Sequence, residues 1–271
     1  MAPGSDADRT DWIGTVHARV QAPPRIACLV PSLTETLFAL GLGACVVART
    51  GFCIHPREGA RRVPKVGGTK DPDLRRLRAL APTHLVVNVD ENRREDVDAA
   101  RAFIPHVVVT HPAGPDDNGC LVTLLGAIFA VESAAAAMVE EFDAALATLD
   151  RTAQALPRER VLYLIWRKPW MSVARETYVS ATLSRAGWDT LPDTSVRRYP
   201  VLADDDTAWR DADRILLSTE PYAFRERDAV ALRETTGKPV LLIDGEWTSW
   251  YGVRASAGML ALAALRMSLL A

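Results

Sequence analysis

The order of strand and helix patterns constrains the fold of this 271-residue chain more than any other feature. Residues 25–110 alternate short apolar runs with amphipathic stretches, and residues 158–270 repeat this alternation. A long helical stripe over about residues 133–156 separates the two stretches. Alternating strands and helices are typical of a mostly parallel sheet that is covered by helices. We therefore predict an α/β protein with two Rossmann-like lobes of β-α units, joined by one long backbone helix.

Apolar spacing and turn residues place the expected elements. Ser32 stands three residues before Glu35, which predicts a capping box at the start of the first helix. In the first lobe we expect strands over 25–32, 45–50, 84–88 and 105–110, with helices over 33–43, 71–82 and 93–103. In the second lobe we expect strands over 160–166, 214–218 and 239–244, with helices over 177–188 and 253–270.

The long helix also sets the expected domain organisation. We predict an N-terminal lobe over 25–116, connecting helices over 117–157 and a C-terminal lobe over 158–271. A helix over 133–156 would be about 36 Å long at 1.5 Å per residue. Such a connector would leave a cleft between the lobes, which is the usual place for a small-molecule site.

Composition and the first residues narrow the function classes. The net charge of −2 argues against a nucleic-acid partner, and no stretch reaches about 18 uninterrupted apolar residues, so we expect no membrane insertion. Residues 1–24 begin with an acidic stretch and lack the apolar run of a signal peptide, which predicts a cytoplasmic location. A periplasmic location is the alternative if a leader preceded this sequence.

Three segments resemble a known family. RIACLVPSLTETLFALGLG (25–43) looks like the first β-α unit of the helical-backbone, class III periplasmic substrate-binding proteins, which are receptors for cobalamin, haem and ferric siderophores. GGTKDPDLRRLRALAPTHLVV (67–87) is similar to their second unit, and PVLLIDGEWTSWYGVR (239–254) to their last strand and the turn into the terminal helix. The resemblance implies two lobes on a backbone helix, with the ligand in the cleft between them.

The same resemblance bears on a transporter partner. Members that dock on an ABC permease carry a Glu at the start of a helix on each lobe, which meets Arg residues of the permease. In this sequence Arg75 stands at that position in the first lobe, and the second position falls near Asp205. A reversed charge in one lobe disfavours that docking mode, so we expect docking on a permease to be weakened.

Cys53 and His55 are the candidate metal contacts. They lie in GFCIHP, directly after an expected strand, and in an extended segment their side chains would point to the same side. A thiolate and an imidazole suit a soft or borderline metal, or the axial position of a metallated macrocycle. The structural alternative is a loop Cys packed in the core and a His at a turn before Pro56.

Other candidate ligand-binding residues lie where expected strands end. Two aromatic loops could form a flat, apolar clamp for a planar ligand, or could instead pack to close each lobe. The aromatic candidates are Trp166, Trp170, Trp247, Trp250 and Tyr251. Polar and charged side chains could meet the periphery of the ligand or merely cap helices. These polar candidates are Lys70, Asn88, Glu91, Arg93, Arg167, Glu220 and Glu246.

These features lead to one preferred function and two alternatives. We predict a receptor for a metal chelate or tetrapyrrole, with cobalamin first and haem or a metal siderophore next. One alternative is an intracellular enzyme that recruited this fold and uses Cys53, His55 and the carboxylates of the cleft on a small organic substrate. Another is a chaperone that hands a metal or cofactor to a partner protein. GxSxG, HExxH and GxGxxG motifs are absent, so no catalytic role is assigned to a residue.

Overall fold

The computed structural model describes residues 5–269 of the chain, and these residues divide into two compact units. Within the described range, unit 1 comprises residues 5–112, 118–141 and 251–253, and unit 2 comprises residues 113–117, 142–250 and 254–269. The α/β prediction is confirmed, because each unit contains a largely parallel sheet with helices against it. The predicted connecting helices are shared between the units, since residues 118–141 belong to unit 1 and the residues that follow belong to unit 2.

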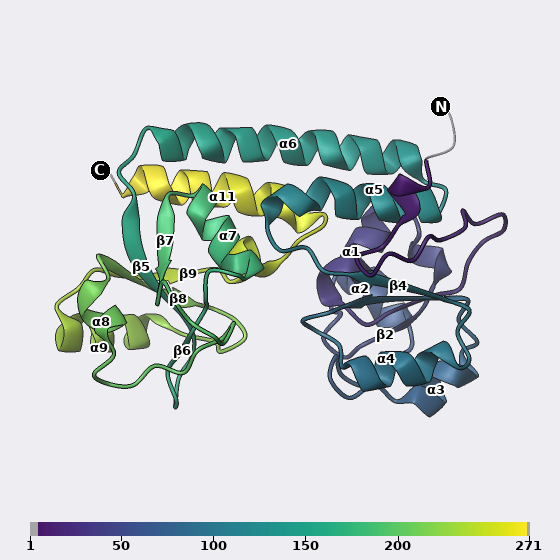
Figure 1. Cartoon of the computed structure of the whole chain (residues 1–271), viewed down its shortest axis with the longest axis horizontal. Helices are drawn as coiled ribbons and strands as arrows, with labels where there is room; N and C mark the ends of the chain where they lie inside the picture. The colour runs from purple at the N-terminus through teal and green to yellow at the C-terminus, as the bar shows by residue number, and fades with distance from the viewer. Residues whose placement is uncertain (1–4, 270–271) are drawn as a thin grey trace. The chain divides into compact units, whose positions relative to one another are not determined.

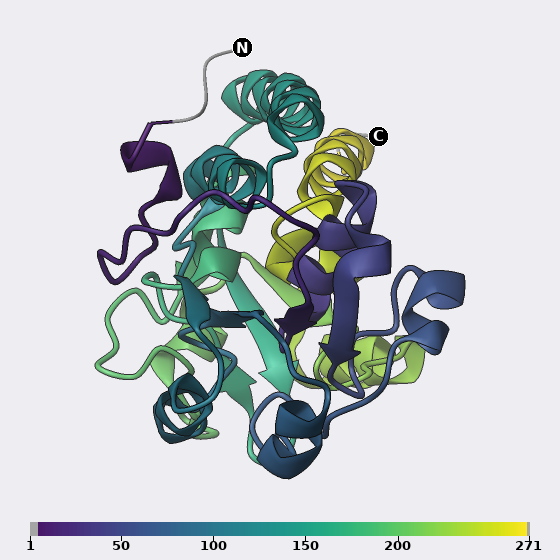
Figure 2. The same cartoon turned by 90° about the vertical axis from the view of Figure 1, so that its right-hand side faces the viewer.

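Unit 1 contains a four-stranded, wholly parallel sheet in the order β2-β1-β3-β4. Its strands are β1 (Ile26–Cys28), β2 (Val46–Arg49), β3 (His84–Asn88) and β4 (His106–Thr110). All five residues of β3 are buried, as expected of a parallel strand that is covered on both faces. Figures 1 and 2 show α3 (Leu74–Ala79) and α4 (Arg94–Arg101) on one face of this sheet. The same views show α1 (Pro31–Ala39) and α5 (Asn118–Ile128) on the other face.

The start of α1 differs from the prediction. β1 ends at Cys28, three residues before the helix begins at Pro31. Pro31 occupies the first turn, Val30 is the N-cap residue, and no side chain caps the helix. The predicted capping box of Ser32 and Glu35 is therefore wrong. Ser32 lies inside the first turn, because proline is tolerated there and allows the helix to start earlier.

The remaining elements of unit 1 are short turns and helices around this sheet. They are η1 (Ala7–Arg9), η2 (Gly43–Cys45), α2 (Arg57–Arg62) and the first part of α6 (Glu132–Gln154).

The residues before β1 pair with β4, the edge strand. Trp12 N donates to Val109 O at 3.1 Å, and Val109 N donates to Asp11 Oδ2 at 3.1 Å. The N-terminal segment thus covers backbone groups that an edge strand otherwise exposes.

Unit 2 contains a second sheet in the order β6-β5-β8-β9, with β7 also pairing with β5. Its strands are β5 (Glu159–Trp166), β6 (Met171–Ser172), β7 (Trp188–Leu191), β8 (Arg214–Ser218) and β9 (Val240–Ile243). Only β6 among these pairs antiparallel. Its helical elements are η3 (Pro115–Asp117), α7 (Tyr178–Arg185), α8 (Thr207–Asp211), α9 (Glu226–Thr236), α10 (Glu246–Ser249), α11 (Arg254–Ser268) and the last part of α6.

Alternate residues of β5 enter two different cores. Val161 and Tyr163 pack with residues of α6, α7 and α11, whereas Leu162 and Leu164 pack with residues of α8 and α9. This period of two is what a strand buried on both faces requires. Tyr163 is buried, and its hydroxyl oxygen lies 2.7 Å from Thr248 Oγ1. Burial raises the pKa of Tyr163 to about 12, so this hydroxyl stays protonated as part of the core.

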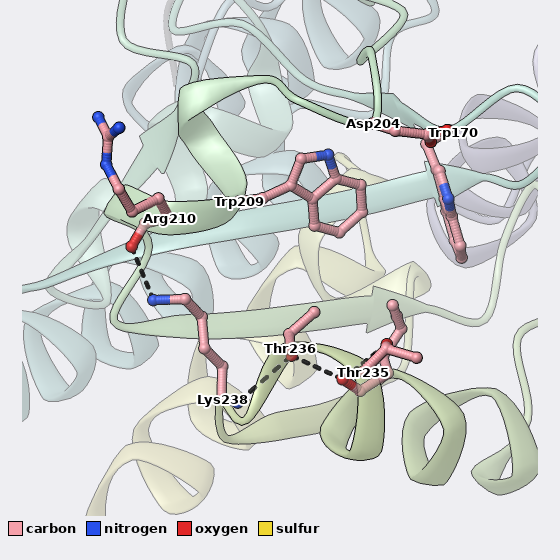
Figure 3. A pocket seen from close by; sticks show the side chains of 8 residues that line it. Trp170, Asp204, Trp209, Arg210, Thr235, Thr236 and Lys238 are labelled. Carbon is pink, nitrogen blue, oxygen red and sulfur yellow. Dashed lines mark hydrogen bonds between the residues drawn. The ribbon is translucent and has the colours of Figure 1, made fainter.

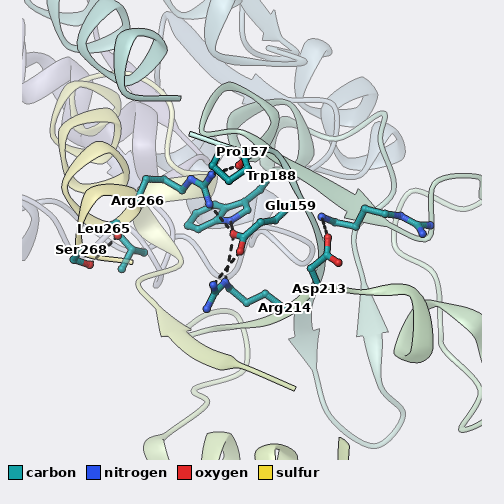
Figure 4. Close-up of polar contacts among 9 residues, drawn as sticks. Pro157, Glu159, Trp188, Asp213, Arg214, Leu265, Arg266 and Ser268 are labelled. Atoms are coloured by element: carbon teal, nitrogen blue, oxygen red, sulfur yellow. Dashed lines mark hydrogen bonds and ion pairs between the residues drawn. The ribbon is translucent and has the colours of Figure 1, made fainter. Parts of the chain in front are cut away.

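One ionic cluster joins the first strand of unit 2 to its last helix (Figure 4). The Glu159 carboxylate accepts from Trp188 Nε1 at 2.8 Å, from Arg214 Nη2 at 3.0 Å and from Arg266 Nη1 at 2.6 Å. Arg266 is buried, and its guanidinium lies 4.9 Å from the centre of the Trp188 ring. Burial acts to raise the pKa of Glu159, but the bonds from Arg214 and Trp188 outweigh it and hold the pKa below its usual value.

No helix within residues 5–269 is both long enough and apolar enough to span a bilayer.

Candidate functional site

The carboxyl-end loops of unit 1 (residues 50–56 and 89–93) expose apolar side chains. Phe52 is 64% exposed, Ile54 57% and Val89 48%. Apolar side chains that form a contiguous exposed patch mark a ligand-binding or partner-binding surface. These three residues were not among the predicted ligand contacts. The signal that could have found them is an apolar residue placed directly after a buried strand, where α/β proteins bind their ligands.

Cys53 and His55 lie in the first of these loops, but only one of them is accessible. The side chain of Cys53 is fully buried, and its sulfur lies 3.1 Å from Thr50 Oγ1. Burial raises the pKa of the Cys53 thiol and outweighs its hydrogen bonds to Thr34 and Thr50, so the thiol stays protonated. His55 is half-buried. The structure therefore leaves His55, and not Cys53, as the candidate metal contact.

Glu91 and Tyr251 form a buried contact inside unit 1. The Tyr251 hydroxyl donates to Glu91 Oε1 at 2.6 Å, and only 6% of the Tyr251 surface is exposed. Burial and the Glu91 carboxylate together raise the pKa of Tyr251 well above its usual value. Tyr251 is thus an anchor of the chain, which corrects the prediction that its ring forms a ligand wall.

The residues after Tyr251 strengthen this anchor. Gly252 N donates to Asn118 Oδ1 at 2.6 Å, and Val253 N donates to Thr36 Oγ1 at 3.1 Å. Gly252 has a φ of +81°, and a Cβ atom there would lie 2.0 Å from Thr36 Oγ1. Only glycine fits this position, because both the backbone conformation and the space exclude a side chain.

The polar candidates of unit 1 divide into structural and accessible groups. Asn88 is buried, and its Oδ1 accepts from Asp90 N at 2.8 Å, so it shapes the turn after β3. Lys70 is exposed and donates to Asp90 O at 2.5 Å. Arg93 is exposed at the N-cap of α4, with no side-chain capping bond. Arg93 and Lys70 therefore remain able to meet an anionic group.

The carboxyl-end loops of unit 2 (residues 167–170, 219–225 and 244–250) carry aromatic side chains. Trp166, the last residue of β5, is 40% exposed, and its ring centre lies 5.5 Å from that of Tyr222 in an edge-to-face arrangement. Tyr222 in turn contacts Phe224, with ring centres 4.6 Å apart. Tyr222 was not predicted, although it follows the turn after β8.

Trp250 contacts Glu220 and Arg254 in unit 2. Its Nε1 donates to Glu220 Oε1 at 2.9 Å, and Ser249 Oγ donates to the same oxygen at 2.8 Å. The Arg254 guanidinium lies 4.9 Å from the centre of the Trp250 ring and forms an ion pair with Glu246. Glu220 thus orients Trp250, and Glu246 orients Arg254. That Glu220 and Glu246 also contact the ligand stays a prediction.

Three further candidates serve packing in unit 2. Trp247 is half-buried against the core that α11 covers. Arg167 pairs with Asp228 at 2.7 Å, and its guanidinium lies 5.5 Å from the centre of the Trp170 ring. Trp170 lines a separate hollow of this unit. That Trp247 forms a ligand wall and that Arg167 meets an anionic group stay predictions.

No group of three or more His, Cys, Asp or Glu side chains in residues 5–269 could hold a metal ion.

Comparison with known proteins identifies the family of this chain. A family model described as periplasmic binding protein matches residues 26–248. The chain belongs to the periplasmic binding protein family. Among curated relatives, a vitamin B12-binding protein of Pectobacterium carotovorum is 21% identical over 239 residues, covering 86% of this chain and 84% of that protein. One from Yersinia pestis is 24% identical over 228 residues, covering 84% and 80%.

Solved structures agree on the fold of this family member. The periplasmic vitamin B12 binding protein BtuF of Vibrio cholerae superimposes with a TM-score of 0.77 at 17% identity, covering 90% of this chain and 98% of that one. The periplasmic heme-binding protein RhuT of Roseiflexus gives a TM-score of 0.76 at 19% identity, covering 91% and 99%. These matches confirm the fold implied by the resemblance of residues 25–43, 67–87 and 239–254.

Proposed function

We propose that this protein is a receptor for a metal-containing tetrapyrrole, with cobalamin as the first candidate and haem as the second. The observation that carries the proposal is the similarity to vitamin B12-binding proteins over at least four fifths of both chains. At 21–24% identity the ligand itself need not be shared. The side chains of the carboxyl-end loops give separate support for a tetrapyrrole ligand.

Those loops fit a large, flat and partly anionic ligand. Phe52, Ile54 and Val89 of unit 1 expose apolar surface that a macrocycle could cover, and Trp166 of unit 2 by itself offers exposed aromatic surface. Lys70 and Arg93 offer cations to anionic groups on the ligand periphery. The imidazole of His55 can replace a water molecule on the metal, as neutral histidine does in many metal complexes.

The first prediction is a spectral one. Titration of the protein with aquocobalamin should give a stoichiometric complex, with a shift of the visible absorption band as the His55 imidazole replaces the cobalt-bound water. His55→Ala should bind more weakly, by about tenfold, and lack the band shift, because it has lost one ligand bond. Haem is titrated in parallel under the same conditions.

His106→Ala is the matched control, since His106 lies at the amino end of β4 and is exposed. It should bind like the unsubstituted protein. A complex that is unaffected by His55→Ala would remove His55 from the site but keep the receptor function. If neither aquocobalamin nor haem binds, the tetrapyrrole proposal fails, and the enzyme and chaperone hypotheses take its place.

The second prediction concerns Trp250. Glu220→Ala removes the carboxylate that accepts from Trp250 Nε1, so the ring loses its fixed orientation. We expect cobalamin binding to weaken by about fivefold in Glu220→Ala, the effect of one hydrogen bond. Trp250→Ala, which also removes the ring, should weaken it by about tenfold or more.

Glu220→Gln keeps an oxygen acceptor for Trp250 Nε1 and should restore most of the affinity. Ser249→Ala removes the other bond to Glu220 and leaves the bond to Trp250 in place, so its effect should be small. Dissociation constants from equilibrium dialysis report all four variants. Equal affinity of Trp250→Ala and the unsubstituted protein would exclude Trp250 from the site.

Docking on an ABC permease is the remaining part of the proposal. Arg75 is exposed on α3 of unit 1, and Asp205 is exposed before α8 of unit 2. Opposite charges on two docking positions do not suit a partner that presents Arg residues to both. We propose that the chain does not use that docking mode; its cytoplasmic location stays a prediction.

A further inference from the structure

A hollow inside unit 2 is lined mostly by residues that lie outside the carboxyl-end loops of that unit. It has a volume of about 560 Å³ and lies between α8 and α9, beside the turn that leads into β6 (Figure 3). α8 has five residues and α9 has eleven. The short α8 covers less of the sheet than α9 does, and a space large enough for a small molecule remains beside it.

Two tryptophan rings form one side of this hollow and are fixed in place. The ring centres of Trp170 and Trp209 lie 5.7 Å apart, edge to face. Trp170 also stacks on Phe224, at 6.1 Å and 10°, and Trp209 Nε1 donates to Ala203 O at 3.0 Å. Because each ring has its own partners, neither is free to collapse into the space, and the aromatic surface is pre-organised for a ligand.

Charges of opposite sign lie at the two ends of the hollow. Figure 3 shows Lys238 and Arg210 on one side of the Trp209 ring, and Asp204 and Trp170 on the other. The Asp204 carboxylate is exposed and lines the hollow. A carboxylate next to an indole ring attracts an ammonium group, both directly and through the ring face.

The basic end can still accept an anion. Lys238 Nζ donates to Arg210 O at 2.8 Å and to Ala212 O at 2.5 Å. An ammonium group has three N–H donors, so one remains for a ligand. The two carbonyls hold the ammonium in place without neutralising its charge.

We propose that this hollow binds a small zwitterion whose ammonium and carboxylate groups are separated by an apolar or aromatic segment, the charge pattern of a dipeptide. The ammonium lies at Asp204 and Trp170, the apolar segment on Trp209, and the carboxylate at Lys238. This site goes beyond the proposed tetrapyrrole function; of its lining residues only Trp170 was among the predicted ligand contacts, and the binding tests of the proposed function do not use it.

The test uses the full chain and the dipeptide phenylalanyl-glycine as the probe. Isothermal titration compares it with its N-acetyl form, which lacks the cation, and with its C-terminal amide, which lacks the anion. We expect the dipeptide to bind, and each modified form to bind at least about threefold more weakly, the effect of one exposed ion pair. Trp209→Ala should weaken dipeptide binding by about tenfold or more.

Two variants test which side chain binds the ammonium group of the dipeptide and which binds its carboxylate. Asp204→Asn should weaken binding of the dipeptide but not of the N-acetyl form, and Lys238→Gln should weaken binding of the dipeptide but not of the amide. Both variants should bind aquocobalamin like the unsubstituted protein, which separates this proposal from the previous one. Equal binding of the dipeptide and both modified forms, or no saturable binding up to about 1 mM, would overturn the zwitterion site.

Discussion

Replacing Glu159 by alanine should lower the free energy of unfolding by about 3 kcal/mol, as removal of one partner from a buried ion pair typically does. The substitution leaves the Arg266 guanidinium, which is 3% exposed, without its carboxylate. It also removes the acceptor of Trp188 Nε1 and the partner of Arg214. Four elements of unit 2 lose a shared contact, since Glu159 begins β5, Trp188 begins β7, Arg214 begins β8 and Arg266 lies in α11. Urea unfolding followed by circular dichroism measures the loss.

The matched control is an ion pair of the same sheet that is open to solvent. Arg158 and Asp189 lie 2.5 Å apart, but their side chains are 52% and 35% exposed. Asp189→Ala should cost less than about 1 kcal/mol, because solvent screens exposed pairs. Glu159→Gln keeps hydrogen-bond acceptors and should fall between the two. A Glu159→Ala variant that is no less stable than Asp189→Ala would show that Arg266 finds another partner.

The parallel sheets could be predicted because their strands are continuous apolar runs. The predicted boundaries 84–88 and 214–218 coincide with β3 and β8, each of which is almost entirely buried. β7 was missed because Trp188 follows a helical pattern and Asp189 interrupts the apolar run. Its strand conformation comes from pairing with β5, which local sequence does not encode.

The candidate site could be predicted as a set of loops, but not side chain by side chain. The carboxyl ends of strands follow from the β-α order, so GFCIHP and the residues after β3 were identified correctly as loops at that edge. Whether a loop side chain faces solvent depends on what packs against it. Cys53 is buried next to Thr50, and Tyr251 is anchored to Glu91, 160 residues earlier in the chain. Neither contact leaves a periodic signal in the sequence.

Acid should lower the free energy of unfolding of unit 1, because His84 is buried there as a neutral imidazole. His84 begins β3 and is 6% exposed. Its ring stacks on His106 with centres 4.7 Å apart and meets Phe129 edge to face at 5.3 Å. Burial, together with the nearby His106 and His17, lowers the pKa of His84 from 6.5 to about 4. The folded chain therefore keeps this imidazole neutral at pH values where the unfolded chain has already bound a proton.

The sign of the pH dependence follows from that difference. Above pH 6.5 the imidazole is neutral in both states, and the stability is full; it falls as the pH drops from 6.5 towards 4, where the loss levels off. At 1.36 kcal/mol per pKa unit, the loss from His84 is about 2 kcal/mol at pH 5 and about 3 kcal/mol at pH 4. Urea unfolding at pH 7, 6 and 5 measures this loss.

His84→Gln, which does not titrate, should lose about 2 kcal/mol less than the unsubstituted chain between pH 7 and pH 5. His106→Gln removes the neighbouring imidazole that helps to lower the pKa of His84, and should reduce the loss in part. An unchanged pH dependence in His84→Gln would mean that another group, and not the buried imidazole at the start of β3, makes the chain sensitive to acid.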